Sequence, residues 1–442
     1  TVRLDVLPAD AGPDGKHIVV ALVRKKISME EQAAKKSILE VKDGTAKRRI
    51  GVISLPTFYQ DFEARRKGDR DFKSATRDVA RLLGELKKDK VDNVLIDLRN
   101  NGGGSLNEAV ELTGLFIDKG PVVQQRNAEG KIEIESDTNA GLAWDGPVGV
   151  LINRGSASAS EIFAAAIQDY GRGLNIGEPS FGKGTVQTLV NLDRFAQGDK
   201  VKYGELKMTI AQFFRINGGT TQLRGVTPDI KLPTMSDSDS FGESSYDNAL
   251  PWTMIKPATY IPAGELKEIV PLLDKKHDAR VAKDKDFQYL LEDIALVKKQ
   301  RKDNLISLNE AARRKERDAQ EARTKLREAR LVAGATPGGD EPVLVPDPKD
   351  ALNKAISAKP ANGKPVPTPK VAAVKGALRT DDGLQADERA LTAELDAEKA
   401  AKAAKDVLLN EAVHILADEV SLLKTDTRMA SRVLPYAADV SK

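Results

Sequence analysis

The sequence predicts an α/β fold in which a layered sheet carries helices, preceded by a pair of strands and followed by a charged helical region. Apolar strands alternate with helical segments between Arg49 and about Pro233. Glycine-rich turns follow two of the strands, whereas the composition beyond residue 236 becomes helical and highly charged. The 442 residues, 40% of them hydrophobic, are enough for two or three domains.

Residues 1–25 show two short strand patterns, Val2–Leu7 and His17–Val23, joined by a turn-rich connector. Two strands cannot bury a core of their own, so we expect them to be the remnant of a small β domain. The chain begins inside a strand pattern, which indicates an N-terminal truncation. Residues 26–48 are charged and have irregular apolar spacing, and we interpret them as a connector.

Residues 49–235 carry the pattern of the α/β layered domain. The predicted strands are Ile50–Leu55, Asn93–Leu98, Val148–Ile152, Leu174–Ile176, Thr185–Leu189 and Leu206–Arg215, and the predicted helices are Asp71–Leu86, Leu106–Phe116 and Ser160–Tyr170. The alternation of strand and helix is typical of parallel sheets with helices on their faces.

The C-terminal part divides into three segments. Residues 236–334 are predicted to form a helical domain, in which Lys298–Arg330 holds 12 basic and 6 acidic residues. This stretch is either a solvated helix face or a docking surface for an acidic partner. Residues 335–375 are rich in Pro, Ala, Gly and Lys and are interpreted as a linker. Residues 376–442 are predicted to be helical and to pack on the other helices.

Composition excludes several classes of function. The net charge of +3 disfavours a nucleic-acid-binding protein, and the lack of cysteine excludes thiol catalysis, disulfides and Cys-ligated zinc. His17, His277 and His414 lie far apart in the sequence, so a histidine-dependent mechanism and a metal site are not expected. No run reaches the ~18 apolar residues of a spanning helix, so we expect no membrane-spanning segment. We also expect no cofactor.

One glycine-rich loop resembles a nucleotide-binding motif. Residues 177–184 nearly fit G-x-x-x-x-G-K-[ST], but Gly184 stands where a hydroxyl must reach magnesium. The following residues have a strand pattern, which leaves no helix N-terminus to face the phosphates. Nucleotide hydrolysis therefore stays a minor alternative.

A serine-rich turn offers a different chemistry. Ser158 lies directly between an apolar strand and a helix, where a nucleophile can be exposed, although such serines also serve as ordinary helix caps. Lys183 lies in a loop without other charges and could act as its base if burial lowered the lysine pKa. Lowering that pKa from ~10.4 to ~7–8 costs about 3–5 kcal/mol.

Three motifs together resemble the carboxyl-terminal processing (tail-specific) proteases, which are serine peptidases with a Ser–Lys dyad. They are Asp97–Gly104, Ser156–Ile162 and Phe181–Gln187, in the family's order and with Lys183 lying 25 residues after Ser158. The resemblance covers residues 1 to 233. The later part, including residues 248–252, resembles the helical extension of the long Gram-negative periplasmic members.

The resemblance assigns roles to individual residues. Ser158 corresponds to the nucleophile, Lys183 to the general base and Gln187 to a residue that orients the lysine. Asp169 matches an acidic position with a supporting role, although a carboxylate beside the lysine would raise the lysine pKa, so Gln187 is the better orienter. The implied oxyanion donors are backbone N–H groups of Gly103, Gly104 and Ala159.

The resemblance also implies a biological setting. The first two strands correspond to the end of a PDZ domain, which binds C-terminal peptides at a sheet edge. The expected function is a periplasmic serine endopeptidase, free or associated with the periplasmic side of the inner membrane. It would cleave unfolded or C-terminally tagged proteins and engage a lipoprotein adaptor. The alternative, from a different class of function, is a non-enzymatic envelope scaffold with a decayed protease domain.

Overall fold

The computed structural model describes residues 1–7, 14–24, 32–44, 46–195, 203–234, 241–333, 341–346 and 405–434. The chain divides into a smaller compact unit (residues 1–31, 305–339 and 352–406) and a larger one (residues 32–304, 340–351 and 407–442). In the smaller unit, β1 (Val2–Val6) pairs antiparallel with β2 (Ile18–Leu22), so the two predicted strands are confirmed. This unit also holds the charged helix α7 (Glu310–Ala333).

The larger unit is built on a seven-stranded sheet with the order β12-β9-β8-β5-β4-β3-β13. Its strands are β3 (Lys35–Asp43), β4 (Ala46–Ser54), β5 (Asn93–Asp97), β8 (Val148–Ile152), β9 (Leu174–Gly177), β12 (Ile230–Lys231) and β13 (Val343–Val345). The strands from β4 to β12 are parallel, whereas β3 and β13 are antiparallel to their neighbours. All five residues of β8 are buried, as expected for a parallel strand covered on both faces.

Helices from the predicted α/β region cover one face of this sheet. The helices are α2 (Ala75–Lys88), α3 (Leu106–Thr113) and α4 (Ala159–Asp169). Leu86 of α2 packs directly over Gly51 of β4, where a Cβ would lie 2.8 Å from the leucine methyl carbons. Asn175 of β9 donates to the Ala164 carbonyl of α4 at 2.9 Å. The expected strands and helices of this region are therefore present.

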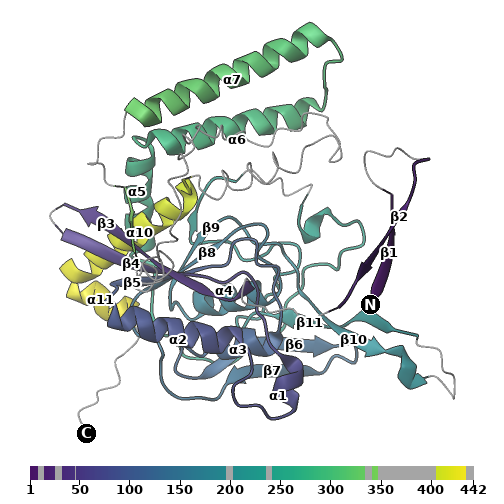
Figure 1. Cartoon of the computed structure of the whole chain (residues 1–442). Coiled ribbons are helices and arrows are strands. Elements are labelled where there is room, and N and C mark those ends of the chain that lie inside the picture. The colour runs from purple at the N-terminus through teal and green to yellow at the C-terminus, as the bar shows by residue number, and fades with distance from the viewer. Residues whose placement is uncertain are drawn as a thin grey trace, which may run out of the picture. The chain divides into compact units, whose positions relative to one another are not determined.

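The opposite face is covered by helices from the C-terminal part of the chain: α10 (Val407–Thr425), α5 (Val270–Val281) and α11 (Thr427–Val433). Figure 1 shows α10, in yellow, beside β3, β4 and β5. Leu416 packs over Gly149 of β8, and α10 adds buried side chains to a core shared with the sheet. The expectation that the last helical segment packs on other helices is thus only half right, because its main contact is the sheet.

Buried polar groups also hold α10 in place. The Glu411 carboxylate contacts Arg280 at 2.7 Å and His277 Nδ1 at 2.7 Å, and both partners lie on α5. Glu419, also buried, accepts a hydrogen bond from Asn93 Nδ2 of β5 at 2.9 Å. Burial of two carboxylates with such partners fixes the axial position of α10 on the sheet.

A second sheet of four antiparallel strands has the order β10-β11-β6-β7. The strands are β10 (Thr185–Asn191), β11 (Glu205–Phe214), β6 (Gly120–Asn127) and β7 (Ile132–Asp137). The sequence predicts β10 and β11 but not β6 and β7. One face of these two strands is largely polar, which weakens the apolar signal of a strand.

Some boundaries differ from expectation. Residues 35–43, interpreted as connector, form β3, because they pair antiparallel with β4 along the whole segment and bury Leu39 and Val41. Residues 343–345, within the predicted linker, add to the sheet as β13. The rest of that linker from residue 347 onward, and residues 376–404, lie outside the described residues. The helix α6 (Lys285–Asp303) ends at Asn304 in the left-handed conformation.

Candidate active site

The three sequence motifs meet at one edge of the central sheet. β9, β8 and β5 are adjacent parallel strands, so their carboxyl ends lie side by side. The glycine turn follows β5, the serine turn follows β8 and the lysine loop follows β9. This edge is where ligands bind in open α/β sheets.

Ser158 begins helix α4 in a strained conformation. Its backbone has φ +57° and ψ −113°, a combination that non-glycine residues rarely adopt. The side chain is half-buried, while its neighbours Ala157 and Ala159 are buried. The sharp turn therefore presents the Ser158 side chain at the surface of an otherwise closed region.

Lys183 lies in the loop before β10, and its side chain is half-buried. Its Nζ lies 3.4 Å from Oε1 of Gln187, four residues further along the chain in β10. Burial lowers the Lys183 pKa, and the nearby positive charge of Lys207 lowers it further, against the opposing effects of Glu243 and Glu161. The neutral form, which can accept a proton, is therefore reached at lower pH than in a free lysine.

Glu161 links the serine turn to the lysine loop. One oxygen of its fully buried carboxylate, Oε2, accepts the N–H of Ser158 at 2.8 Å and the N–H of Lys183 at 3.0 Å. The other oxygen accepts the Ser180 hydroxyl at 2.6 Å and the Gly182 N–H at 2.7 Å. Burial raises the Glu161 pKa to about 7, although the four hydrogen bonds oppose this rise. The backbones of Ser158 and Lys183 thus share one acceptor atom.

The glycine turn lies against Ser158. A Cβ on Gly103 would lie 2.8 Å from the Ser158 Cβ and 3.0 Å from the Ala159 nitrogen, so only glycine fits there. The Gly103 N–H donates to Asn101 Oδ1 at 2.9 Å. In the described part of the chain, the N–H groups of Gly104 and Ala159 have no acceptor. These two groups are available to an oxyanion.

Asn101 ties this turn to the serine turn. Its carbonyl accepts the Ala157 N–H at 2.9 Å and the Ser160 hydroxyl at 2.8 Å. Its side-chain amide donates to the Leu55 carbonyl at 2.7 Å. Neither Asn101 nor Glu161 was predicted from the sequence to have a functional role.

Asp169 lies at the other end of α4 from Ser158. At 1.5 Å per residue, the eleven residues of α4 span ~16 Å. Arg215 binds both Asp169 oxygens, at 2.6 and 3.0 Å, and Asn217 donates to one of them at 2.8 Å. These contacts join α4 to the end of β11 and leave Asp169 away from the serine and the lysine.

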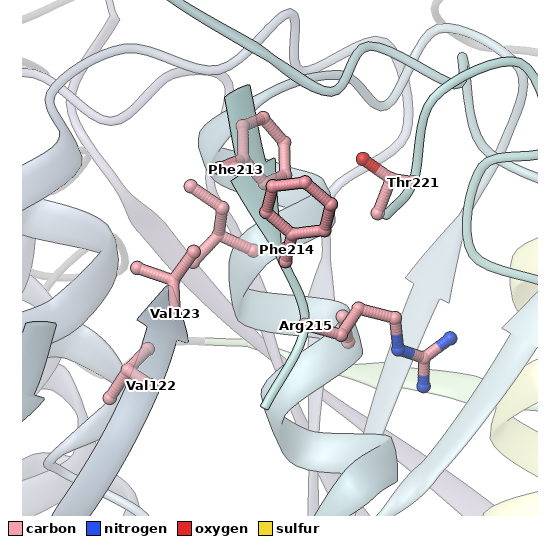
Figure 2. Close-up of a pocket in the computed structure, with 8 residues that line it drawn as sticks. Val122, Val123, Phe213, Phe214, Arg215 and Thr221 are labelled. Atoms are coloured by element: carbon pink, nitrogen blue, oxygen red, sulfur yellow. The ribbon is translucent and has the colours of Figure 1, made fainter. Parts of the chain in front are cut away.

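A small gap between α4 and the second sheet does not extend the site. Figure 2 shows Val122, Val123, Phe213, Phe214, Arg215 and Thr221 around it. These side chains leave no room for even a water molecule, so the region is packed core. Among the described residues, no group of three or more His, Asp or Glu could hold a metal ion. No helix in the described ranges is long and apolar enough to cross a membrane.

Comparison with known proteins agrees with this arrangement. The model of peptidase family S41 matches residues 49–232, and the model of the C-terminal domain of tail specific protease matches residues 236–421. Residues 49–232 belong to peptidase family S41, and the chain as a whole is similar to the carboxyl-terminal processing (tail-specific) proteases. The S41 match contains all three motifs of the site.

Individual relatives match different shares of this chain. It is 43% identical over 325 residues to the Tail-specific protease of Haemophilus influenzae, which is 73% of the chain but 44% of that protein. It is 38% identical over 182 residues to the Carboxy-terminal-processing protease of Bartonella bacilliformis, 41% of this chain and 38% of that one. The structure of the photosystem II D1 C-terminal processing protease is 29% identical over 50% of this chain and 54% of that chain, with a TM-score of 0.38. The chain thus spans less than half the length of these two sequence relatives.

Proposed function

We propose that this protein is a serine endopeptidase in which Ser158 is the nucleophile and Lys183 the general base. The observation that carries the proposal is the shared Glu161 oxygen, which binds the backbone N–H groups of both residues at 2.8 and 3.0 Å. A serine at a strained strand-to-helix turn and a lysine with a lowered pKa are the two groups that this chemistry needs.

The reaction proceeds by acyl transfer. The neutral Lys183 amine takes the proton of the Ser158 hydroxyl while Oγ bonds to the scissile carbonyl carbon. The N–H groups of Ala159 and Gly104 stabilise the negative oxygen of the tetrahedral intermediate. Its collapse breaks the C–N bond, and the Lys183 ammonium returns the proton to the leaving amine. Water then hydrolyses the ester with the same lysine as base.

Gln187 holds the base without adding charge. Its amide oxygen lies 3.4 Å from the Lys183 Nζ and can accept a hydrogen bond from it. A neutral amide orients the lysine but does not stabilise the ammonium as strongly as a carboxylate would. This supports the assignment of Gln187, instead of Asp169, as the residue that orients Lys183.

The substrates we propose are unfolded proteins and proteins with an exposed or tagged C-terminus. The relatives' names, Tail-specific protease and Carboxy-terminal-processing protease, support this substrate class. We further propose that β1 and β2 belong to a PDZ domain and that the protein acts in the periplasm. Residues 236–442 would engage a lipoprotein adaptor or an envelope substrate through their charged helices.

The test is peptide hydrolysis by variants of the intact protein. Ser158→Ala and Lys183→Ala should each lower kcat by at least ~10³-fold, and Lys183→Arg should fail as well because a guanidinium stays protonated. Ser136→Ala and Lys119→Ala, at exposed positions, are the matched controls and should keep full activity. Near wild-type rates for Lys183→Ala would reject the dyad. A wild-type protein without Ser158-dependent cleavage would favour the scaffold alternative.

A further inference from the structure

Residues 241–245, here called the strap, lie against the lysine loop. The buried side chain of Arg154, in the serine turn, holds both segments at once. Its Nε donates to the Phe241 carbonyl at 2.8 Å and its Nη2 to the Ser244 hydroxyl at 2.9 Å, both in the strap. Its Nη1 donates to the Ser180 carbonyl of the lysine loop at 2.6 Å. One guanidinium therefore joins the serine turn, the lysine loop and the strap.

The strap contacts the loop directly before Lys183 and is linked to the residue after Lys183 through Gln222. The Glu243 N–H donates to the Phe181 carbonyl at 3.0 Å, and the rings of Phe241 and Phe181 meet edge to face. The Glu243 carboxylate accepts a hydrogen bond from the Gln222 amide at 3.0 Å. The same Gln222 side chain accepts the Gly184 N–H at 2.8 Å.

The close fit of the strap depends on a glycine. Gly242 is buried and has φ +121°, a conformation that other residues rarely adopt. A Cβ at this position would overlap the guanidinium of Arg154. The strap backbone thus rests directly on the side chain that also holds the lysine loop.

We propose that the strap is part of the active site and that Glu243 is a positioning residue for Lys183. The strap belongs to the region that matches the C-terminal domain of tail specific protease and lies beyond the match to the peptidase family. The C-terminal region therefore contributes directly to the geometry and the charge around the base. This inference rests on the proposed Ser–Lys mechanism and adds a function for a segment outside the catalytic motifs.

Charges from three elements face Lys183. Lys207 on β11 lowers the Lys183 pKa, whereas Glu243 of the strap and Glu161 of α4 raise it. Lys207 pairs across the hairpin with Leu189, two residues from Gln187, so it lies on the same face as the side chain that holds the lysine. Removing Glu243 or Lys207 should therefore move the pH dependence of the base in opposite directions.

The first test is the pH profile of kcat/KM in the intact protein. Glu243→Gln keeps the shape and the bond to Gln222 but removes the charge, so the acid limb should move to lower pH by about 0.5 unit. Lys207→Gln should move it to higher pH by a similar amount. Asp247→Asn, an exposed carboxylate two residues beyond the strap, is the matched control and should leave the profile unchanged. Equal profiles for Glu243→Gln and Asp247→Asn would overturn the inference.

The second test displaces the strap. Gly242→Ala should lower kcat by at least ~10-fold with a smaller change in KM, because the loop that carries Lys183 loses its support. Gly141→Ala has a similar backbone strain, with φ +100°, but no atom lies within 4 Å of the added Cβ. This control should keep kcat. Equal kcat for the two alanine variants would contradict a role for the strap.

The two proposals fail in different ways. If the mechanism is wrong, the wild-type protein will show no cleavage that depends on Ser158 and Lys183, and no strap variant will be informative about the base. If only the strap inference is wrong, that cleavage will be present and its pH profile will be the same in the wild type, Glu243→Gln and Asp247→Asn.

Discussion

Glu161 is the residue on which the geometry of the candidate site depends most directly. Its carboxylate accepts four hydrogen bonds, two of them from the backbones of the proposed nucleophile and base. A carboxylate can accept at both oxygens, whereas an amide presents a donor at one of them. Exchange of Glu161 for glutamine must therefore leave at least one pair of buried donors without an acceptor.

We expect Glu161→Gln to lower kcat by at least ~10²-fold, because a small displacement of Ser158 against Lys183 is enough for such a loss. The variant should also lose about 1–3 kcal/mol of unfolding free energy per unsatisfied donor. Peptide hydrolysis and thermal unfolding measure the two effects. Glu419→Gln, at another fully buried carboxylate whose pKa burial raises to about 7, is the control and should lose stability without losing kcat. A fully active Glu161→Gln would contradict the positioning role.

Part of this site could be predicted from the sequence. The strand-to-helix position of Ser158 and the uncharged loop around Lys183 follow from local pattern, and Gln187 followed from the family resemblance. The role of Glu161 was hidden, because Ser158-x-x-Glu161 has the spacing of a helix capping box and predicts only a helix start. Arg154 carries no local signal, since its partners lie in segments distant in the sequence. The contacts of Asp169 with Arg215 likewise depend on tertiary structure.

At the scale of elements, helix α10 completes the core of the central sheet. Leu416 is fully buried and packs over Gly149 of β8. Without α10, apolar side chains of β4, β5 and β8 such as Val52, Leu95 and Leu151 would be exposed to water. The helix is thus a structural part of the unit that holds the candidate site.

We expect Leu416→Ala to lower the free energy of unfolding by about 2–5 kcal/mol, the usual cost of a cavity at a buried leucine. Chemical denaturation of the larger unit measures this loss. Leu189→Ala, at a 61% exposed position on β10 of the same unit, is the matched control and should change stability by less than about 0.5 kcal/mol. Equal effects at the two positions would mean that α10 does not pack as described.

Helical periodicity predicted a helix in the α10 region, but not its partner. Its leucines and alanines could face other helices or a sheet equally well, because the same apolar stripe suits both. β3 was missed for a related reason: Lys35, Lys36, Glu40 and Lys42 interrupt the apolar pattern, and only pairing with β4 shows that the segment is a strand. The parallel strands β5 and β8 were the easiest elements to predict from the sequence, since they are apolar on both faces.

At the scale of the whole chain, the two matched domains share one core. The peptidase match ends at residue 232, but α5, α10 and the strap come from the region of the C-terminal domain match. A deletion after Pro233 would therefore remove part of the core and the support of the lysine loop together. Point substitutions in the charged helices are the suitable way to test the proposed adaptor role of residues 236–442.

The proposed mechanism requires Lys183, in its neutral form, to be the base for Ser158. Because a protonated lysine cannot accept the serine proton, activity should rise with pH as Lys183 loses its proton, and its lowered pKa moves this rise below the usual 10.5. The pH dependence of kcat/KM for the intact protein tests this most directly, with Lys183→Ala measured across the same range. We expect an acid limb below pH 10.5 in the wild type and no measurable turnover at any pH in the variant. A limb near pH 10.5, or a variant that keeps the wild-type profile, would contradict this mechanism.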